Sequence, residues 1–189
     1  MLRAVLFNDL YTAIIVVSLA SIVTAKALKP QRFTALLKLV GNSNYLRIHL
    51  KDHKFLDPFD IILFLNFCIN GMLTSLLTYQ DYVKKIEIDS LLFLKLSAGL
   101  GAAILVKILI ELGVGTLFDL QKLFHSYVFQ QVSSLNFLGI VLLLLNSILI
   151  YGVPNNRFLL IFILSVSGLI LLIGMLKSIK LYQKLLINN

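Results

Sequence analysis

The sequence has few of the residues on which soluble or disulfide-bonded domains depend. Only 14% of its 189 residues are charged, there is no tryptophan, and Cys68 is the single cysteine. Soluble domains carry about 25% charged residues, so this composition excludes an ordinary water-soluble fold. One cysteine excludes an intrachain disulfide and leaves the redox compartment open. Acidic residues are also scarce, 9 against 17 Lys and Arg, which gives a formal net charge of +8.

Long apolar runs take the place of the missing charges. Hydrophobic residues make up 59% of the chain, and about 20 consecutive apolar residues suffice to cross a hydrocarbon core of about 30 Å. The runs predict an all-α, polytopic transmembrane bundle, built as a single integral-membrane domain over residues 1–189. Five spans are predicted, at about 10–28, 61–79, 91–112, 132–153 and 158–176.

The basic residues flank the apolar runs and predict the orientation. Lys and Arg near span ends stay in the cytoplasm, and eleven lie on the side that follows the first span, against four on the other. We therefore expect a bacterial inner-membrane protein with its N-terminus outside and its C-terminal segment in the cytoplasm. A cleaved signal peptide carries its positive charge before the apolar core, whereas only Arg3 precedes this one. The first span is therefore expected to be retained.

The region 29–58 is the only sizeable polar part of the chain, and it predicts amphipathic interfacial helices. In "PQRFTALLKLV", Phe33 and Leu36 recur at helical spacing after Pro30, and the helix is expected to end at Gly41. Basic amphipathic segments beside spans commonly lie in the headgroup plane. We therefore expect this loop to bind anionic lipid headgroups, and we expect no nucleic-acid partner.

"HLKDH" places His49 and His53 one helical turn apart, a spacing that zinc hydrolases use together with a Glu beside the first His. Leu50 occupies that Glu position, and Asp52 or Asp57 would have to complete the site. Two histidines in a basic amphipathic loop are more often solvated or lipid-facing. We therefore expect no metal and no cofactor here. Because no nucleophile constellation accompanies the pair, we expect no enzymatic activity.

Three asparagines lie within predicted spans. Asn66 and Asn70 share a face of the second span, and Asn146 lies in the fourth. Amides inside spans usually form hydrogen bonds between helices. A role in binding a solute is the alternative, because intramembrane polar groups face other helices or a cavity.

Lys95, Gly99, Ala103, Lys107 and Glu111 recur every fourth residue along the third span. Such a stripe winds slowly around a helix, and its small residues let another helix approach closely. Lys107 and Glu111 can form an ion pair one turn apart near the inner boundary. Either this pair snorkels and anchors the helix end, or Lys107 meets a partner subunit or a lipid phosphate.

Other small residues complete the description of this span. Small residues four apart also occur at Ser97–Gly101 and Ala98–Ala102, so several faces could pack closely. Gly113 and Gly115 are expected to break the helix at its end. The following "TLFDLQKLFHSYVF" is expected to form a further amphipathic segment.

Three stretches carry a family resemblance: "FNDLYTAIIVVSLASIVTAKALKPQRF", "NYLRIHLKDHKFLDPFDIILFLNF" and "LVKILIELGVGTLF". Together they resemble an uncharacterised integral-membrane family of Bacteroidota, domain of unknown function 4271. The resemblance implies an inner-membrane location and a multi-span helical fold, and it brings no catalytic residues. It also implies a further apolar helix after a segment like "SIKLYQKLLINN".

Two functions from different classes remain open on the sequence. The first is a non-enzymatic subunit or scaffold of a larger inner-membrane complex, for which the lineage suggests envelope secretion or motility machinery. The second is a small-solute or ion transporter whose path is lined by Asn66, Asn70 and the charges of the third span. Transporters commonly show inverted repeats and broken helices, and neither is readable in this sequence.

Overall fold

The computed structural model describes residues 2–39, 57–82, 90–153 and 156–187, and this part of the chain is helical without a strand. The helices are α1 (Leu2–Leu28), α2 (Pro30–Leu37), α4 (Pro58–Tyr82), α5 (Ser90–Leu117), α6 (Gln121–Ser147), the short π-helix η1 (Ile148–Gly152) and α7 (Arg157–Ile187). Five helices are long and apolar enough to cross a membrane. This confirms the predicted all-α, membrane-embedded bundle.

The predicted spans coincide with the apolar centres of these helices, but several helices extend further. α6 begins at Gln121 rather than at about 132, and α7 continues past Lys177 to Ile187. A charged or polar residue ends an apolar run without ending a helix, because Lys and Gln are good helix formers. Hydropathy therefore located the part of each helix suited to the bilayer but not its ends.

The break expected at Gly113 and Gly115 does not occur, because α5 runs through both to Leu117. Gly115 instead allows a close approach: a Cβ placed there would lie 2.7 Å from the Cβ of Phe124 in α6. The chain turns after Leu117, at Asp119, whose φ is 55°. Most of the segment "TLFDLQKLFHSYVF", which was predicted to be amphipathic, therefore forms the start of α6.

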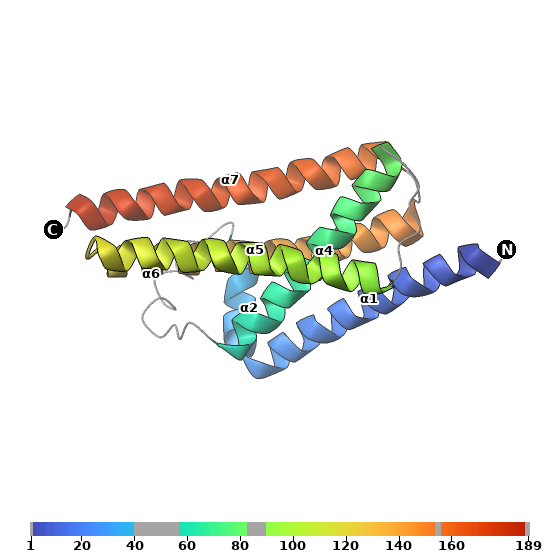
Figure 1. Cartoon of the computed structure of the whole chain (residues 1–189), viewed down its shortest axis with the longest axis horizontal. Helices are drawn as coiled ribbons and strands as arrows, with labels where there is room; N and C mark the ends of the chain where they lie inside the picture. The colour runs from blue at the N-terminus through green and yellow to red at the C-terminus, as the bar shows by residue number, and fades with distance from the viewer. Residues whose placement is uncertain (1, 40–56, 83–89, 154–155, 188–189) are drawn as a thin grey trace.

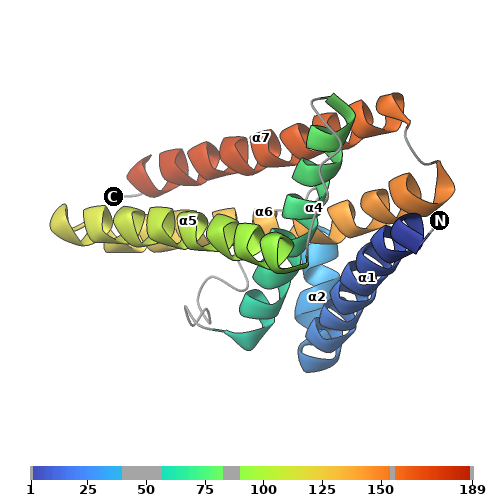
Figure 2. The same cartoon turned by 45° about the vertical axis from the view of Figure 1, so that its right-hand side comes forward.

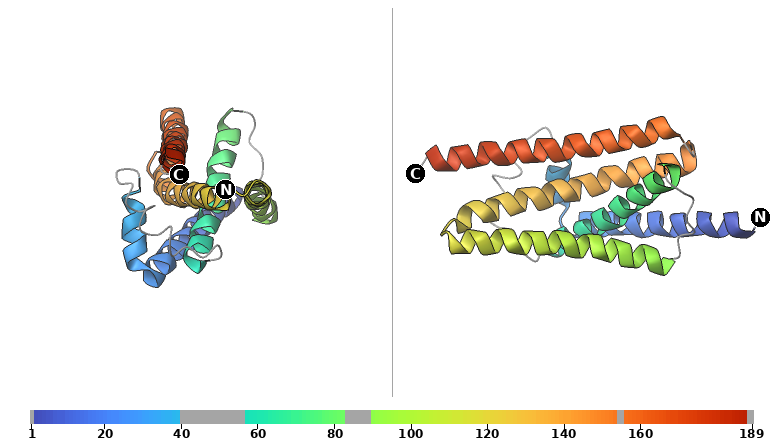
Figure 3. Two further views of the ribbon diagram at one scale, coloured as in Figure 1. Left: turned by 90° about the vertical axis from the view of Figure 1, so that its left-hand side faces the viewer. Right: turned by 45° about the horizontal axis from the view of Figure 1, so that its top comes forward.

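α6 is the central helix of the bundle. It contacts α1, α2, α4, α5 and α7 and is the most enclosed of the five spans (Figure 1). α4 crosses the bundle obliquely and packs against α1, α5 and α6 (Figure 2). α5, α6 and α7 run antiparallel in turn (Figure 3). The start of α1 and the end of α7 lie at opposite ends of the long axis. This arrangement suits five successive crossings of a bilayer.

α4 and α6 approach each other closely, backbone to backbone, at their crossing. A Cβ at Gly139 would lie 2.7 Å from the backbone Cα of Phe67, so only glycine fits at this point. By contrast, the outer faces of α5 and α7 expose large apolar side chains such as Leu109 and Phe158. Exposed apolar faces of this extent are typical of helices surrounded by lipid.

α2 is an amphipathic helix, as predicted, and it ends at Leu37, earlier than the expected end at Gly41. It buries Phe33 and Leu36 in an apolar cluster with residues of α1, α4 and α6. Arg32 lies on the same buried side. A buried arginine on a short helix requires partners, and these lie at the start of α4.

Candidate functional site

Two four-residue segments with the same pattern begin helices α2 and α4. "KPQR" (Lys29–Arg32) and "DPFD" (Asp57–Asp60) each contain a charge, a proline, an uncharged residue and a second charge. The residue before a proline is biased away from helical backbone, and Lys29 has φ −142° and ψ 76°. Proline then fits the first helical position. In both segments the second charge therefore falls in the first helical turn.

The acidic segment caps α4. Oδ1 of Asp57 accepts a hydrogen bond from the backbone N–H of Phe59 at 3.2 Å, and the Asp57 carbonyl accepts one from the N–H of Asp60 at 2.9 Å. Carboxylates at a helix N-terminus interact favourably with the helix dipole. Lys29 and Arg32 lie at the N-terminus of α2, where the helix dipole is unfavourable for a positive charge. They are therefore stabilised only by partners outside α2.

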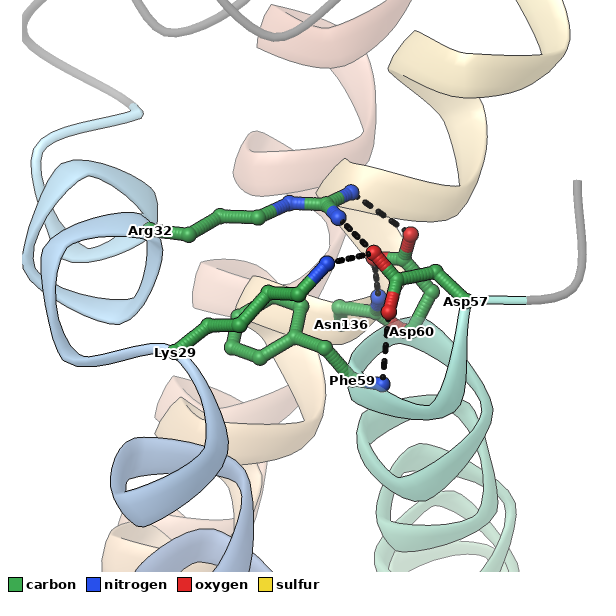
Figure 4. A network of polar contacts seen from close by, with 6 residues as sticks. All are labelled: Lys29, Arg32, Asp57, Phe59, Asp60 and Asn136. Carbon is green, nitrogen blue, oxygen red and sulfur yellow. Dashed lines mark hydrogen bonds and ion pairs between the residues drawn. The ribbon is translucent and has the colours of Figure 1, made fainter. Parts of the chain in front are cut away.

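The two segments meet in a cluster of charged and polar side chains (Figure 4). Arg32 reaches from α2 and donates through Nη1 to Asp57 and through Nη2 to Asp60, the latter at 2.6 Å. Lys29 donates to Asp57 at 2.5 Å, and Nδ2 of Asn136 in α6 donates to Oδ1 of Asp60 at 3.2 Å. We call these five residues the ion cluster. It joins the α1–α2 corner, the start of α4 and the middle of α6.

The ion cluster is enclosed on all sides except that of Lys29. The side chains of Arg32 and Asp60 are 7% and 6% exposed, whereas that of Lys29 is 47% exposed. The Arg32 guanidinium also lies over the ring of Phe59, 4.9 Å from its centroid, and 5.8 Å from that of Phe129. Two positive and two negative charges balance, which a buried ionic group requires.

Asp57 is held in its charged form. Burial by itself would raise the pKa of Asp57, but hydrogen bonds from Lys29 and the Phe59 N–H, together with the charges of Arg32 and Lys29, outweigh it and hold the pKa below its usual value. A lowered carboxyl pKa contributes stability that is present above the unfolded-state pKa and is lost as the pH falls through the folded-state value. Asp57 therefore stabilises the cluster at neutral pH.

Neither Arg32 nor Asp60 is among the site residues predicted from the sequence. The sequence does contain a signal for their pairing: "KPQR" and "DPFD" each hold a proline between charges of one sign, and the two signs are opposite. Their pairing joins residues 25 and 28 positions apart, which no local pattern reports. Among the described residues, no three His, Cys, Asp or Glu side chains come together as a metal site. The carboxylates of the cluster are occupied by cationic side chains.

The predicted asparagines lie in the bundle interior and link three helices. Nδ2 of Asn70 donates to the Ser18 hydroxyl of α1 at 3.1 Å. Nδ2 of Asn146 in α6 donates to the backbone carbonyl of Asn70 at 3.1 Å, and the Ser21 hydroxyl donates to Oδ1 of Asn66 at 3.2 Å. These contacts have the form expected of interhelical hydrogen bonds.

The first part of the predicted stripe on α5, from Lys95 to Ala103, faces away from the rest of the described chain. Lys95, Ala103 and Lys107 are exposed, and a Cβ at Gly99 would meet nothing within 4 Å. The covered face carries Phe93, Ser97, Gly101, Ile108 and Gly115. Both faces contain small residues, but only the covered one adds large side chains that fill the core.

One of the small-residue pairs, Ser97–Gly101, does pack closely. A Cβ at Gly101 would lie 3.2 Å from Sγ of Cys68 in α4. Ser97 is buried on the same side. The pair therefore sets the distance between α4 and α5, while the Gly99–Ala103 pair is not covered by the described part of the chain.

Lys107 and Glu111 form the predicted ion pair at 3.5 Å, with side chains 54% and 18% exposed. Gln131 of α6 joins them. In the amide orientation that suits both charges, its oxygen accepts from Lys107 at 2.6 Å and its nitrogen donates to Glu111 at 3.1 Å. Glu111 thus faces protein, and Lys107 stands at the edge of that contact.

We expect Lys107 and Glu111 to act together. Removing one partner of a pair away from water strands the other, so Lys107→Leu or Glu111→Leu alone should lower thermal stability more than the double substitution does. A double-mutant cycle in detergent measures this coupling. Small, additive effects of about 0–1 kcal/mol would instead reduce the pair to a solvated helix anchor.

Most of the predicted basic loop, including His49 and His53, lies outside the described residues. The expectation that "HLKDH" binds no metal therefore stays a prediction. The described ends of the region, 29–39 and 57–58, supply Lys29, Arg32 and Asp57 to the ion cluster.

Comparison with known families gives a match along nearly the whole chain. The model of the family described as domain of unknown function DUF4271 matches residues 11–189. The chain belongs to the DUF4271 family. No curated protein and no solved structure matches it. The matched region of this DUF4271 protein contains every member of the ion cluster, the asparagine network and the α5 stripe. The family description assigns no activity, so a function has to be argued from these features.

Proposed function

We propose that this DUF4271 protein is a non-enzymatic subunit or scaffold of a larger complex in a bacterial inner membrane. The observation that carries this proposal is the uncovered face of α5. Lys95, Gly99, Ala103 and Lys107 lie on one side of an apolar helix, and no part of the described chain covers Gly99. Ionisable side chains within spans usually face protein or headgroups rather than lipid tails.

The shape and charge of this face suit a helix of another protein. Small residues let two helix backbones approach closely in a bilayer. A second copy of this chain in the same orientation would place Lys95 near Lys95 and Lys107 near Lys107, and like charges repel. A helix bearing carboxylates is the complementary partner. Envelope secretion or motility machinery is the type of assembly that we propose.

The interior of the bundle supports a structural role over an enzymatic one. Asn66, Asn70 and Asn146 are engaged in hydrogen bonds between helices, and Arg32 with its carboxylates fixes the α1–α2 corner. Buried polar networks of this kind specify one arrangement of helices. They supply a rigid support for the uncovered α5 face.

We further propose the orientation with the N-terminus outside and the α2 region in the cytoplasm, where its basic residues contact anionic headgroups. The excess of Lys and Arg on that side supports it. With Cys68 replaced by alanine, a cysteine at Thr34 should resist a membrane-impermeant thiol reagent in intact cells, and one at Asn156 should react. The opposite labelling pattern would reverse the assignment.

Purification from native membranes in mild detergent tests the subunit proposal. The unmodified protein should retain another membrane protein, and Gly99→Leu should lose it. Gly168→Leu is the matched control, because Gly168 on α7 also has no neighbour within 4 Å of its Cβ position, and it should retain the partner. Recovery of a homo-oligomer alone, or equal loss in both variants, would contradict the proposal.

A transporter of small solutes or ions is the second candidate, and the asparagine network favours it. Asn66 and Asn70 each keep one buried side-chain atom without a partner in the described part of the chain. Polar groups of this kind can line a path. Solute uptake by reconstituted vesicles that is abolished by Asn70→Leu would favour this function over a subunit role.

A further inference from the structure

The side of the ion cluster formed by α6 contains two buried atoms that lack hydrogen-bond partners. Oδ1 of Asn136 and Oγ of Ser133 have none within the described residues, and both side chains are 0% exposed. Phe129, Ser133 and Asn136 are spaced four and three residues apart and therefore share a helix face. The ring of Phe129 lies against Arg32, and Asn136 donates to Asp60. Ser133 lies between them on that face.

Asn136 can form a hydrogen bond with Asp60 whether or not the carboxyl group of Asp60 carries a proton. In the present arrangement its Nδ2 donates to Oδ1 of Asp60 at 3.2 Å, which suits a carboxylate. Amide nitrogen and oxygen occupy nearly the same shape, so a half-turn of the side-chain amide would put Oδ1 beside Asp60. That oxygen could accept a hydrogen bond from a protonated carboxyl group. A polar neighbour able to pair with both forms is what a proton site requires.

The charge balance ties protonation to the position of α2. Among the described residues, the charges that act on Asp60 include those of Arg32 and Lys29 from the α1–α2 corner and of Asp57 from the start of α4. The α6 residues on this side carry no charge. With both carboxylates ionised, the cluster is neutral. One added proton leaves two cations facing a single carboxylate, and an uncompensated buried charge is strongly destabilising.

We propose that Asp60 is a proton-binding site, and that its protonation loosens α2 from the bundle. The proton comes from water and is held on the Asp60 carboxyl, which then donates to Oδ1 of Asn136. Oδ2 of Asp60, which accepts from Arg32 at 2.6 Å, then belongs to a neutral carboxyl group instead of a carboxylate. The first turn of α2 is therefore held less strongly to α4. This role goes beyond that of a membrane subunit, because it makes the α2 face responsive to acid.

A buried and an exposed position on α2 provide a direct readout. Leu36 is 0% exposed and lies one turn after Arg32, whereas Thr34 is exposed. Leu36→Cys and Thr34→Cys, each with Cys68→Ala, are purified in detergent and labelled with a maleimide. The ratio of the two rates cancels the pH dependence of the thiol reaction. From about pH 8 to about pH 5, a range that spans the ionisation of buried carboxyl groups, the ratio should rise about tenfold.

Variants of the two carboxylates distinguish the proton site from general acid damage. Asp60→Asn mimics the protonated form, and its ratio should be high at both pH values. Asp57→Asn also leaves Lys29 and Arg32 with one carboxylate, so its ratio should already be higher than the parent's at about pH 8. Because it keeps Asp60, the ratio should still rise on acidification. A ratio that does not change with pH in the parent, or one that still rises in Asp60→Asn, would overturn the proposal. A response to sodium in place of choline at constant pH, without a response to pH, would also overturn it and assign a metal cation instead.

Discussion

Arg32→Met is expected to lower the free energy of unfolding by about 3–5 kcal/mol, because removing one member of a buried ionic group strands its partners. Arg32 contacts both Asp57 and Asp60, and its side chain is 7% exposed. Methionine retains the apolar stem but no charge. Asp60 would then lose the guanidinium that contacts it at 2.6 Å. Adding Asp60→Leu to Arg32→Met should recover part of the lost stability.

The single cysteine makes this measurement straightforward. Cys68 is 3% exposed, so a dye that fluoresces on reaction with thiols reports unfolding in detergent. Arg157→Met is the control, because Arg157 is 68% exposed and pairs with Asp81 at 3.2 Å at the other end of the bundle. Exposed pairs contribute about 0–1 kcal/mol. Equal effects of Arg32→Met and Arg157→Met would show that the ion cluster does not hold the fold.

Gly139→Ala is expected to destabilise the protein by about 3 kcal/mol, the upper end for overpacking a core. The added methyl would lie 2.7 Å from the Cα and 2.9 Å from the backbone nitrogen of Phe67. Backbone atoms cannot move aside as a flexible side chain can. α4 and α6 would therefore have to separate at their crossing.

Gly99→Ala provides the matched comparison in a second span. A Cβ at Gly99 meets nothing within 4 Å, and alanine in a helix interior is more favourable than glycine by about 1 kcal/mol. The isolated chain should therefore be unaffected or stabilised by this change. The same thiol dye measures both variants. A melting temperature of Gly139→Ala equal to that of Gly99→Ala would contradict the close approach of α4 and α6.

Much of the fold follows from local sequence properties. The apolar runs predicted the five spans because each span must satisfy its own backbone hydrogen bonds and present apolar side chains to lipid. Pro30 marked the start of an amphipathic helix for an equally local reason, since proline fixes its own φ and constrains the residue before it. The Lys107–Glu111 pair was also foreseeable, because both residues lie on one helix.

Tertiary structure decided which of these local elements face one another. α5 has small residues on several faces, and only packing against Cys68 and Phe124 selects the face of Gly101 and Gly115. "KPQR" and "DPFD" are each readable as the start of a helix. Their pairing depends on where α1 ends relative to α4, and on α6 bringing Asn136 to the same point. Spans and helix starts are set by interactions within a few residues, whereas the ion cluster needs side chains from three separate segments of the chain.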